Sequence, residues 1–195
     1  MNRITWAMGL LVAFAATGRS TPVLPTITTI PVSGDVSGNP GDTVGWGLTL
    51  TFNAPSDWVV LNDSYFTGAQ VYGAYQDYVS SQFIVAGPAP ESSPVTVDYV
   101  QGSTGLGEFD IYSFAPPGSS ITGDINVDYS IFSQDPNDPL FDPASFVTSG
   151  VASAAVDVIV PPAVPEPGTV FLVVAAAIAL ALWRRIAGRG TAGAS

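Results

Sequence analysis

The sequence contains no cysteine, no histidine and no lysine. Without cysteine, the chain can form neither a disulfide nor a thiolate metal site. Without histidine and lysine, it lacks the usual general bases and activated nucleophiles, and its many serines have no histidine partner. We therefore predict that the protein is not an enzyme. A glycosidase, which needs only two carboxylates, is the remaining catalytic alternative.

Basic charge is scarce and lies only near the two ends of the chain. The five basic residues are Arg3, Arg19, Arg184, Arg185 and Arg189, whereas residues 20–164 contain fifteen acids and no base. This body has a formal charge near −15 and no side-chain salt bridge, so its acids must be solvated, capped by backbone N–H groups or neutralised by cations. A surface of this kind repels nucleic acid and anionic lipid, so nucleic acid is not an expected partner.

The N-terminal segment has the outline of a secretory signal peptide. Residues 1–20 contain one early positive charge, Arg3, then an apolar stretch over residues 4–16, and then small residues. Cleavage is expected before Arg19 or after Ser20. An uncleaved N-terminal anchor is the alternative.

The C-terminal segment combines a rigid tripeptide, a short apolar run and a basic stop. Pro165 and Pro167 disfavour helix around Glu166, so this site is expected to be extended and accessible. The run over residues 169–183 would span about 22 Å as a helix, less than the roughly 30 Å of a hydrocarbon core. Flanking arginines can extend to lipid headgroups and place the C-terminus in the cytoplasm. A core helix of a soluble domain is the alternative.

Together these features resemble the PEP-CTERM sorting signal. The motif residues are Val164, Pro165, Glu166 and Pro167, and the membrane stop is formed by Arg184, Arg185 and Arg189. The resemblance implies export through the secretion machinery, anchoring in the inner membrane by the C-terminal helix, and processing by an exosortase. It also implies a final location at the cell surface or in an extracellular matrix, such as a biofilm rich in exopolysaccharide.

Alternation of apolar and polar residues predicts β-strands in the body. Residues 42–53 and 121–133 alternate as half-buried antiparallel strands do, with Gly123 as the one gap in the apolar positions of the second segment. Six shorter strands are predicted at residues 26–32, 58–61, 82–85, 95–100, 108–114 and 156–160.

Seven or eight strands separated by proline- and glycine-rich turns predict an all-β fold, a single antiparallel β-sandwich. The run Gly41-Asp42-Thr43-Val44 resembles the second strand of bacterial Ig-like surface domains. The expected organisation is a signal peptide at residues 1–20, an exported sandwich at 21–160, a proline-rich linker with the motif at 161–167, and a transmembrane helix with a basic tail at 168–195.

An acidic loop is a candidate calcium site. Residues 134–143 contain Asp135, Asn137, Asp138 and Asp142 with no cation nearby, and Ca²⁺ binds six to eight such oxygens. The spacing is not that of an EF-hand. The alternative is a proline-rich surface loop whose Asp and Asn side chains cap turns. Calcium is the only cofactor that the sequence suggests.

A cluster of tyrosines is a candidate carbohydrate contact. Tyr72, Tyr75 and Tyr78 lie among glycine, glutamine and aspartate, and aromatic faces beside amides and carboxylates are typical of polysaccharide-binding surfaces. Packing against the sandwich is the alternative and is favoured. We expect a non-enzymatic structural or interaction role on the cell surface, with a calcium-assisted carbohydrate-binding module as the second hypothesis.

Overall fold

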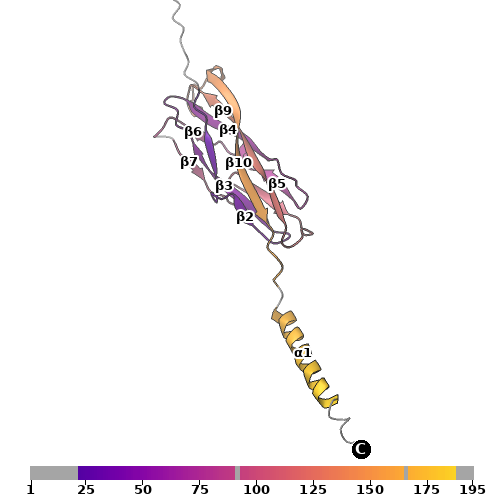
Figure 1. Cartoon of the computed structure of the whole chain (residues 1–195). Helices are drawn as coiled ribbons and strands as arrows, with labels where there is room; N and C mark the ends of the chain where they lie inside the picture. The colour runs from indigo at the N-terminus through magenta and orange to yellow at the C-terminus, as the bar shows by residue number, and fades with distance from the viewer. Residues whose placement is uncertain (1–21, 91–92, 165–166, 188–195) are drawn as a thin grey trace, which may run out of the picture.

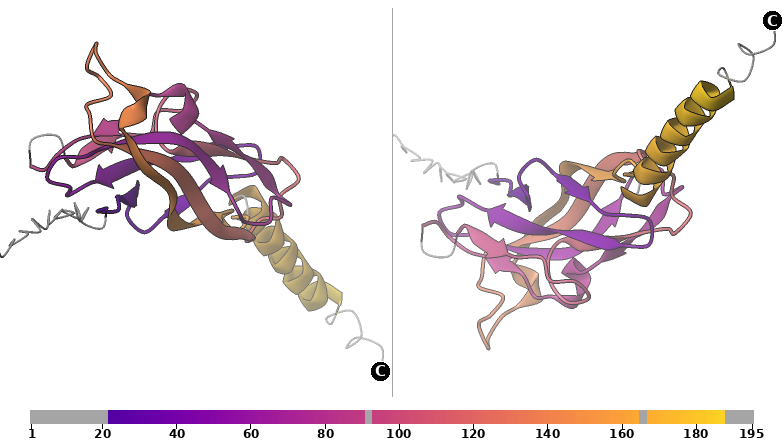
Figure 2. Two further views of the ribbon diagram at one scale, coloured as in Figure 1. Left: turned by 90° about the horizontal axis from the view of Figure 1, so that it is seen from above. Right: turned by 90° about the horizontal axis from the view of Figure 1, so that it is seen from below.

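The computed structural model describes residues 22–90, 93–164 and 167–187 as two β-sheets packed face to face and a separate helix (Figure 1). The predicted signal peptide lies outside the described residues. Figure 2 shows the two layers from above and below, with the helix beyond one end of the sandwich. The prediction of an all-β sandwich is confirmed.

The first sheet is built around β3. Its strand order is β1-β3-β8-β5, and β7 also pairs with β3. The strands span β1 (Thr26–Ile30), β3 (Thr43–Thr51), β5 (Gly73–Asp77), β7 (Val95–Val97) and β8 (Gly107–Ile111). One edge of β3 pairs with β1, and the other pairs with β7 and β8 in succession. All pairs in this sheet are antiparallel.

The second sheet is built around a long hairpin. Its strand order is β2-β10-β9-β4-β6. The strands span β2 (Asp35–Ser37), β4 (Trp58–Phe66), β6 (Val85–Ala86), β9 (Ser120–Phe132) and β10 (Phe146–Ile159). The short pairing of β2 with β10 is parallel, which corrects the prediction of a wholly antiparallel sandwich. The chain passes from the first sheet to the second between β1 and β2.

The two alternating segments supply the facing layers of the core. Trp46, Leu48 and Leu50 of β3 are fully buried, and so are Ile125 and Ile131 of β9. The Trp46 indole N–H donates to the Gly34 carbonyl oxygen at 2.7 Å, so its polar atom is satisfied inside the core. The apolar positions of the period-two pattern are therefore buried in the core in both strands.

The outer face of β3 is covered, although alternation predicts that it meets solvent. A Cβ at Gly45 would lie 2.3 Å from the Tyr99 ring, and one at Gly47 would lie 2.6 Å from the Val97 carbonyl oxygen. These glycines thus allow the Tyr99 ring and the backbone that follows β7 to lie close against β3.

Several strands differ from the sequence prediction. β10 begins at Phe146, ten residues before the predicted start, and β2 and β5 were not predicted. Residues 148–155 of β10 are mostly serine, glycine and alanine and lie at a sheet edge, so this stretch has little apolar alternation. β6 covers only the end of the segment predicted at residues 82–85 and continues beyond it.

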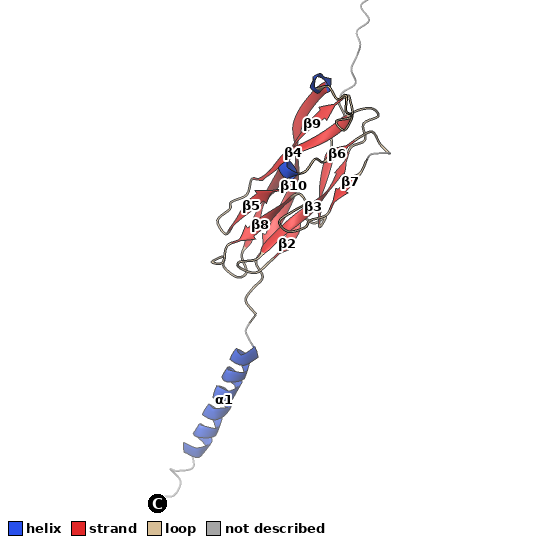
Figure 3. Ribbon diagram, turned by 180° about the vertical axis from the view of Figure 1, so that it is seen from behind, coloured by secondary structure: helices blue, strands red, loops and turns tan. Residues whose placement is uncertain are grey.

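The helix α1 (Pro167–Ala187) follows the sandwich (Figure 3). All side chains of residues 171–180 are exposed, including Phe171 at 75% and Leu172 at 72%. Within the described residues, no helix has both the length and the apolar character that a membrane crossing requires. Pro165, Glu166 and Arg189 of the predicted sorting signal lie outside the described residues.

A buried polar network joins the two sheets at the β4–β5 side. The Ser64 hydroxyl of β4 contacts the Tyr75 hydroxyl at 2.7 Å and the Leu106 carbonyl oxygen at 2.9 Å, and it donates to the Asp77 carboxylate. Asp77 also accepts from the backbone N–H groups of Ser64 and of Val79 in the 3-10 helix η1 (Val79–Ser81). Ser64 is only 5% exposed, so these hydrogen bonds form in a largely desolvated place.

We predict that Ser64→Ala lowers the free energy of unfolding by about 1–3 kcal/mol, because it removes the hydroxyl from several buried partners. Chemical denaturation followed by tryptophan fluorescence measures this loss. Ser119→Ala is the matched control, because the Ser119 hydroxyl is buried and has no hydrogen-bond partner among the described residues. Equal effects of the two substitutions would contradict the stabilising role of the network.

Candidate functional site

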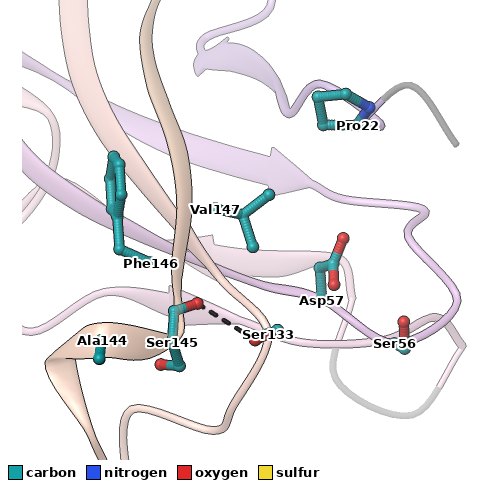
Figure 4. A pocket seen from close by; sticks show the side chains of 8 residues that line it. All are labelled: Pro22, Ser56, Asp57, Ser133, Ala144, Ser145, Phe146 and Val147. Carbon is teal, nitrogen blue, oxygen red and sulfur yellow. Dashed lines mark hydrogen bonds between the residues drawn. The ribbon is translucent and has the colours of Figure 1, made fainter. Parts of the chain in front are cut away.

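A shallow hollow lies where β9 leads into β10 (Figure 4), whereas α1 follows the other end of β10 (Figure 1). Its volume is about 230 Å³. Four separate segments line it: Pro22, Ser56 and Asp57, Ser133, and Ala144, Ser145, Phe146 and Val147. The Ser133 hydroxyl donates to the Ser145 carbonyl oxygen at 3.1 Å, which holds the two ends of the β9–β10 connection together.

Aromatic rings lie beside this hollow on the outer face of the second sheet. Phe132 of β9 packs edge-on against Phe141 at 5.2 Å and against Phe146 at 5.9 Å between ring centroids. Trp58 of β4 is the cross-strand partner of Phe132 on its other side. Phe146 keeps 49% of its surface exposed, so one ring of this row is available to a ligand.

The hollow can hold an uncharged molecule rich in hydroxyl groups. The Asp57 carboxylate and the serine oxygens supply acceptors, and the Phe146 ring supplies an apolar face. The Ser145 hydroxyl is buried, so the serine hydroxyl groups that a ligand can reach are those of the exposed Ser56 and Ser133. Sequence patterns did not reveal this site, because its residues come from four segments that are far apart in the chain.

The acidic loop uses its carboxylates to cap turns. Asp135 accepts from the Asn137 backbone N–H, Asp138 from that of Leu140, and Asp142 from that of Ala144, each at 2.8 Å. The last of these caps η2 (Pro143–Ser145). In the part of the chain that the structure describes, no three acidic side chains gather as a metal site would require. The turn-capping interpretation is confirmed, and calcium binding stays a prediction.

The tyrosine cluster faces the core. Tyr78 is only 4% exposed, which corrects the hypothesis that its ring contacts carbohydrate. Tyr72 and Tyr75 are half-buried against the core, and the Tyr75 hydroxyl donates to the Leu106 carbonyl oxygen at 3.0 Å. Burial, together with the nearby Glu108 carboxylate, raises the pKa of Tyr78 to about 12. The favoured packing interpretation therefore holds for Tyr78 and Tyr75.

Glu108 is a buried carboxylate, 6% exposed. It accepts from the Gly102 backbone N–H at 3.1 Å and from the Tyr99 hydroxyl at 3.3 Å. Burial first, and then this carboxylate, raise the pKa of Tyr99 above its ordinary value. This is a satisfied structural group that uses phenol and backbone donors instead of a cation.

Two carboxylates face each other on the outer face of the second sheet. Asp63 of β4 is the cross-strand partner of Asp128 of β9. Partial desolvation and then the Asp128 charge raise the pKa of Asp63. Like charges placed directly opposite destabilise a sheet, so cations near this pair relieve repulsion.

The described residues of the predicted sorting signal follow the last strand of the sandwich. Val164 is 84% exposed, and Pro167 is the first residue of α1. Arg184 and Arg185 belong to the last turns of the same helix.

Comparisons with known proteins assign no family. No protein-family model and no curated protein matches the chain. An ASH/PapD-like domain of human CEP192 (PapD-like domain 7) is similar at 11% identity and a TM-score of 0.29, over 82% of this chain and 99% of that one. The sixth cohesin of Acetivibrio cellulolyticus scaffoldin B, in complex with a mutant Cel5 dockerin, is similar at 17% identity and a TM-score of 0.26, over 72% and 99%. Likenesses this distant carry no argument about function.

We predict that Ca²⁺ raises the melting temperature more than NaCl of equal ionic strength. Fifteen carboxylates without a base repel one another, and a cation bound only by the folded state adds stability by mass action. Differential scanning calorimetry measures both effects. The triple variant Asp135→Asn, Asp138→Asn and Asp142→Asn should remove the excess, whereas Asp63→Asn with Asp128→Asn is the control away from the loop.

Equal increases with the two salts would mean that screening alone acts and would rule out a calcium site. An excess that survives the triple variant but disappears with the control would place the cation between Asp63 and Asp128.

Proposed function

We propose that this chain is an exported, non-enzymatic protein of the cell surface or the exopolysaccharide matrix. In this proposal a PEP-CTERM-type signal at its C-terminus directs it to an exosortase. The observation that carries the proposal is a helix of exposed apolar side chains joined to an acidic β-sandwich by an accessible, proline-rich segment.

The helix needs an apolar environment that the sandwich does not supply. From residue 171 to residue 180 every side chain is exposed, and none is charged. Val173, Val174 and Ile178 are 65%, 50% and 56% exposed, so the apolar surface is not restricted to one stripe that could pack on a sheet. A helix that is apolar on all sides is usually buried in protein or lipid. We infer that α1 associates with the inner membrane, with its arginine-rich end toward the cytoplasm.

The segment before the helix is suited to recognition by a processing enzyme. Val160 is fully buried and is the last core residue, whereas Val164 is 84% exposed. The chain therefore leaves the core and becomes accessible within four residues. The prolines at 161 and 162 keep this stretch extended, which is the conformation that a transpeptidase cleft can bind.

The charge distribution agrees with this topology. The sandwich contains carboxylates only, and three of the five arginines follow the apolar run. An anionic lipid surface repels the sandwich and attracts the arginines. This arrangement favours a sandwich that lies outside the membrane and a C-terminus that stays on the cytoplasmic side.

We predict that replacing Pro165-Glu166-Pro167 with three alanines blocks processing. The full-length precursor should then accumulate in the inner membrane of a strain that has an exosortase, as measured by cell fractionation and mass spectrometry. Replacing Pro161-Pro162 with two alanines should have a smaller effect, because it loosens the extended linker but leaves the motif intact. An unchanged mass and location of the motif variant would rule out the sorting role.

The hollow beside Phe146 favours a second candidate function, binding of a saccharide. It combines an exposed aromatic ring with a carboxylate and three serines, and no basic residue lies in the sandwich to attract an anionic ligand. A neutral saccharide has the required hydroxyl groups and an apolar ring face. Under this second function the protein is a carbohydrate-binding module. Calcium assists saccharide binding if the acidic loop binds the ion.

We predict that Phe146→Ala and Asp57→Asn each weaken the binding of neutral polysaccharide by at least about tenfold, or about 1.4 kcal/mol. Isothermal titration calorimetry with and without Ca²⁺ measures the affinity. Val151→Ala is the control, because Val151 is an exposed apolar residue of the same strand outside the hollow. Absence of heat with the unaltered protein would remove this second function and leave the sorting proposal untouched.

A further inference from the structure

The outer edge of β10 is open along most of its length. β2 pairs only with Asp157, Val158 and Ile159, so residues 148–155 pair with β9 on one side and with no strand on the other within the described part of the chain. At the end that pairs with β2, the Asp157 N–H donates to the Gly34 carbonyl oxygen at 3.3 Å. The Ile159 carbonyl oxygen accepts from the Gly38 N–H at 3.1 Å. Backbone groups two residues apart point the same way.

The backbone groups of Ser149, Val151 and Ser153 therefore point out of the sheet. Like Asp157 and Ile159, these residues have odd numbers, and the Asp157 N–H and the Ile159 C=O face away from β9. In the described residues, no backbone group pairs with them on that side. Strands with such unpaired donors and acceptors are templates for the addition of another strand.

This edge also lacks most of the features that natural sheets use to prevent pairing. Residues 146–156 contain no charged residue and no proline, and the one irregularity of the β9–β10 ladder is between Phe146 and Thr148, at the start of the strand. Exposed edges normally carry lysines, prolines or inward charges, or are very short. β10 is fourteen residues long. The sandwich carries fifteen carboxylates, yet this edge has none. An open edge without charge can pair with a strand of another chain.

We propose that β10 pairs with β10 of a second copy of this chain, antiparallel and centred on Val151. In this register Val151 lies opposite Val151 of the second copy, and Ser149 lies opposite Ser153. On the inner face, Gly150 lies opposite Ala152. The sequence around Val151 is thus nearly symmetric in size, and every facing pair is small and uncharged. A strand from an unrelated protein has no reason to match this symmetry.

The negative charge of the two bodies does not prevent this pairing at physiological salt. Asp128 is the β9 neighbour of Val151, so the Asp128 carboxylates of the two copies are three strand spacings apart, or about 14 Å. The Debye length is about 8 Å at 0.15 M salt but about 30 Å at 0.01 M. Repulsion is therefore screened at the higher salt concentration and acts across the interface at the lower one.

The register also determines the direction of the two copies. The β10 strands run antiparallel, and α1 follows the C-terminal end of β10, so the two helices leave from opposite ends of the dimer. Where the chain is anchored as proposed above, such a dimer joins copies on two facing surfaces. Copies released from the membrane pair in the same way.

Single cysteines in the full chain test the proposal, because the natural sequence has none. In an antiparallel hydrogen-bonded pair the Cα atoms are about 5.5 Å apart, within the range that a disulfide spans. Val151→Cys, solubilised in mild detergent at 150 mM NaCl and oxidised, should form a disulfide dimer at least about tenfold faster than Ala155→Cys, whose two copies lie about 27 Å apart in this register. Both sites are exposed on the same strand, so the comparison controls for reactivity.

A second pair of variants tests the register itself. Ser149→Cys and Ser153→Cys should each crosslink slowly alone and rapidly when mixed, and the Val151→Cys rate should fall at 10 mM NaCl. Equal rates at positions 151 and 155, or a mixture no faster than its components, would overturn the proposal. In that case a strand from another protein is the remaining candidate for this edge.

Discussion

The constraint on which this structure depends is that residues 20–164 must accommodate fifteen carboxylates without one basic side chain. Donors for them come from the backbone and from hydroxyl groups. Asp77 collects N–H groups from β4 and η1, and Glu108 is held by Gly102 and Tyr99. Such bonds are short-range and directional, so they fix turns and sheet contacts. A charge pair at the surface would add little by comparison.

The same constraint separates the functions of the parts. A body that carries only negative charge repels an anionic membrane and nucleic acid, so the membrane attachment that we propose falls to the C-terminal segment. What the body can bind is limited to cations, neutral hydroxyl-rich molecules and backbone edges. The hollow beside Phe146 and the open edge of β10 belong to the last two of these classes, and neither needs a basic residue.

Much of the fold could be predicted because the apolar side chains of β3 and β9 alternate with polar or glycine positions over most of each strand and form the two core layers. The strands that pair with β3 and β9 have weaker sequence patterns. β5 was missed because Tyr75 turns inward onto a buried polar network that no periodicity encodes. The hollow could not be predicted, since Asp57, Ser133 and Phe146 meet only through the pairing of β4, β9 and β10. The acidic loop was correctly interpreted as a set of turn caps, because an Asp followed two residues later by a free N–H is a local signal.

β10 was the hardest strand to predict and also has an unpaired backbone edge. Both properties have one cause. A strand is recognised in a sequence when a layer of protein lies over one face and neighbours flank both edges, because burial then selects large apolar residues at alternate positions. Ala152 and Ala154 of β10 face inward yet stay half-exposed, since no strand lies beyond them. Relaxed selection for size permits the run of serine, glycine and alanine that hides the strand. The same small residues leave the edge unobstructed, so weak alternation within a long hairpin strand is itself an indication that another chain can pair there.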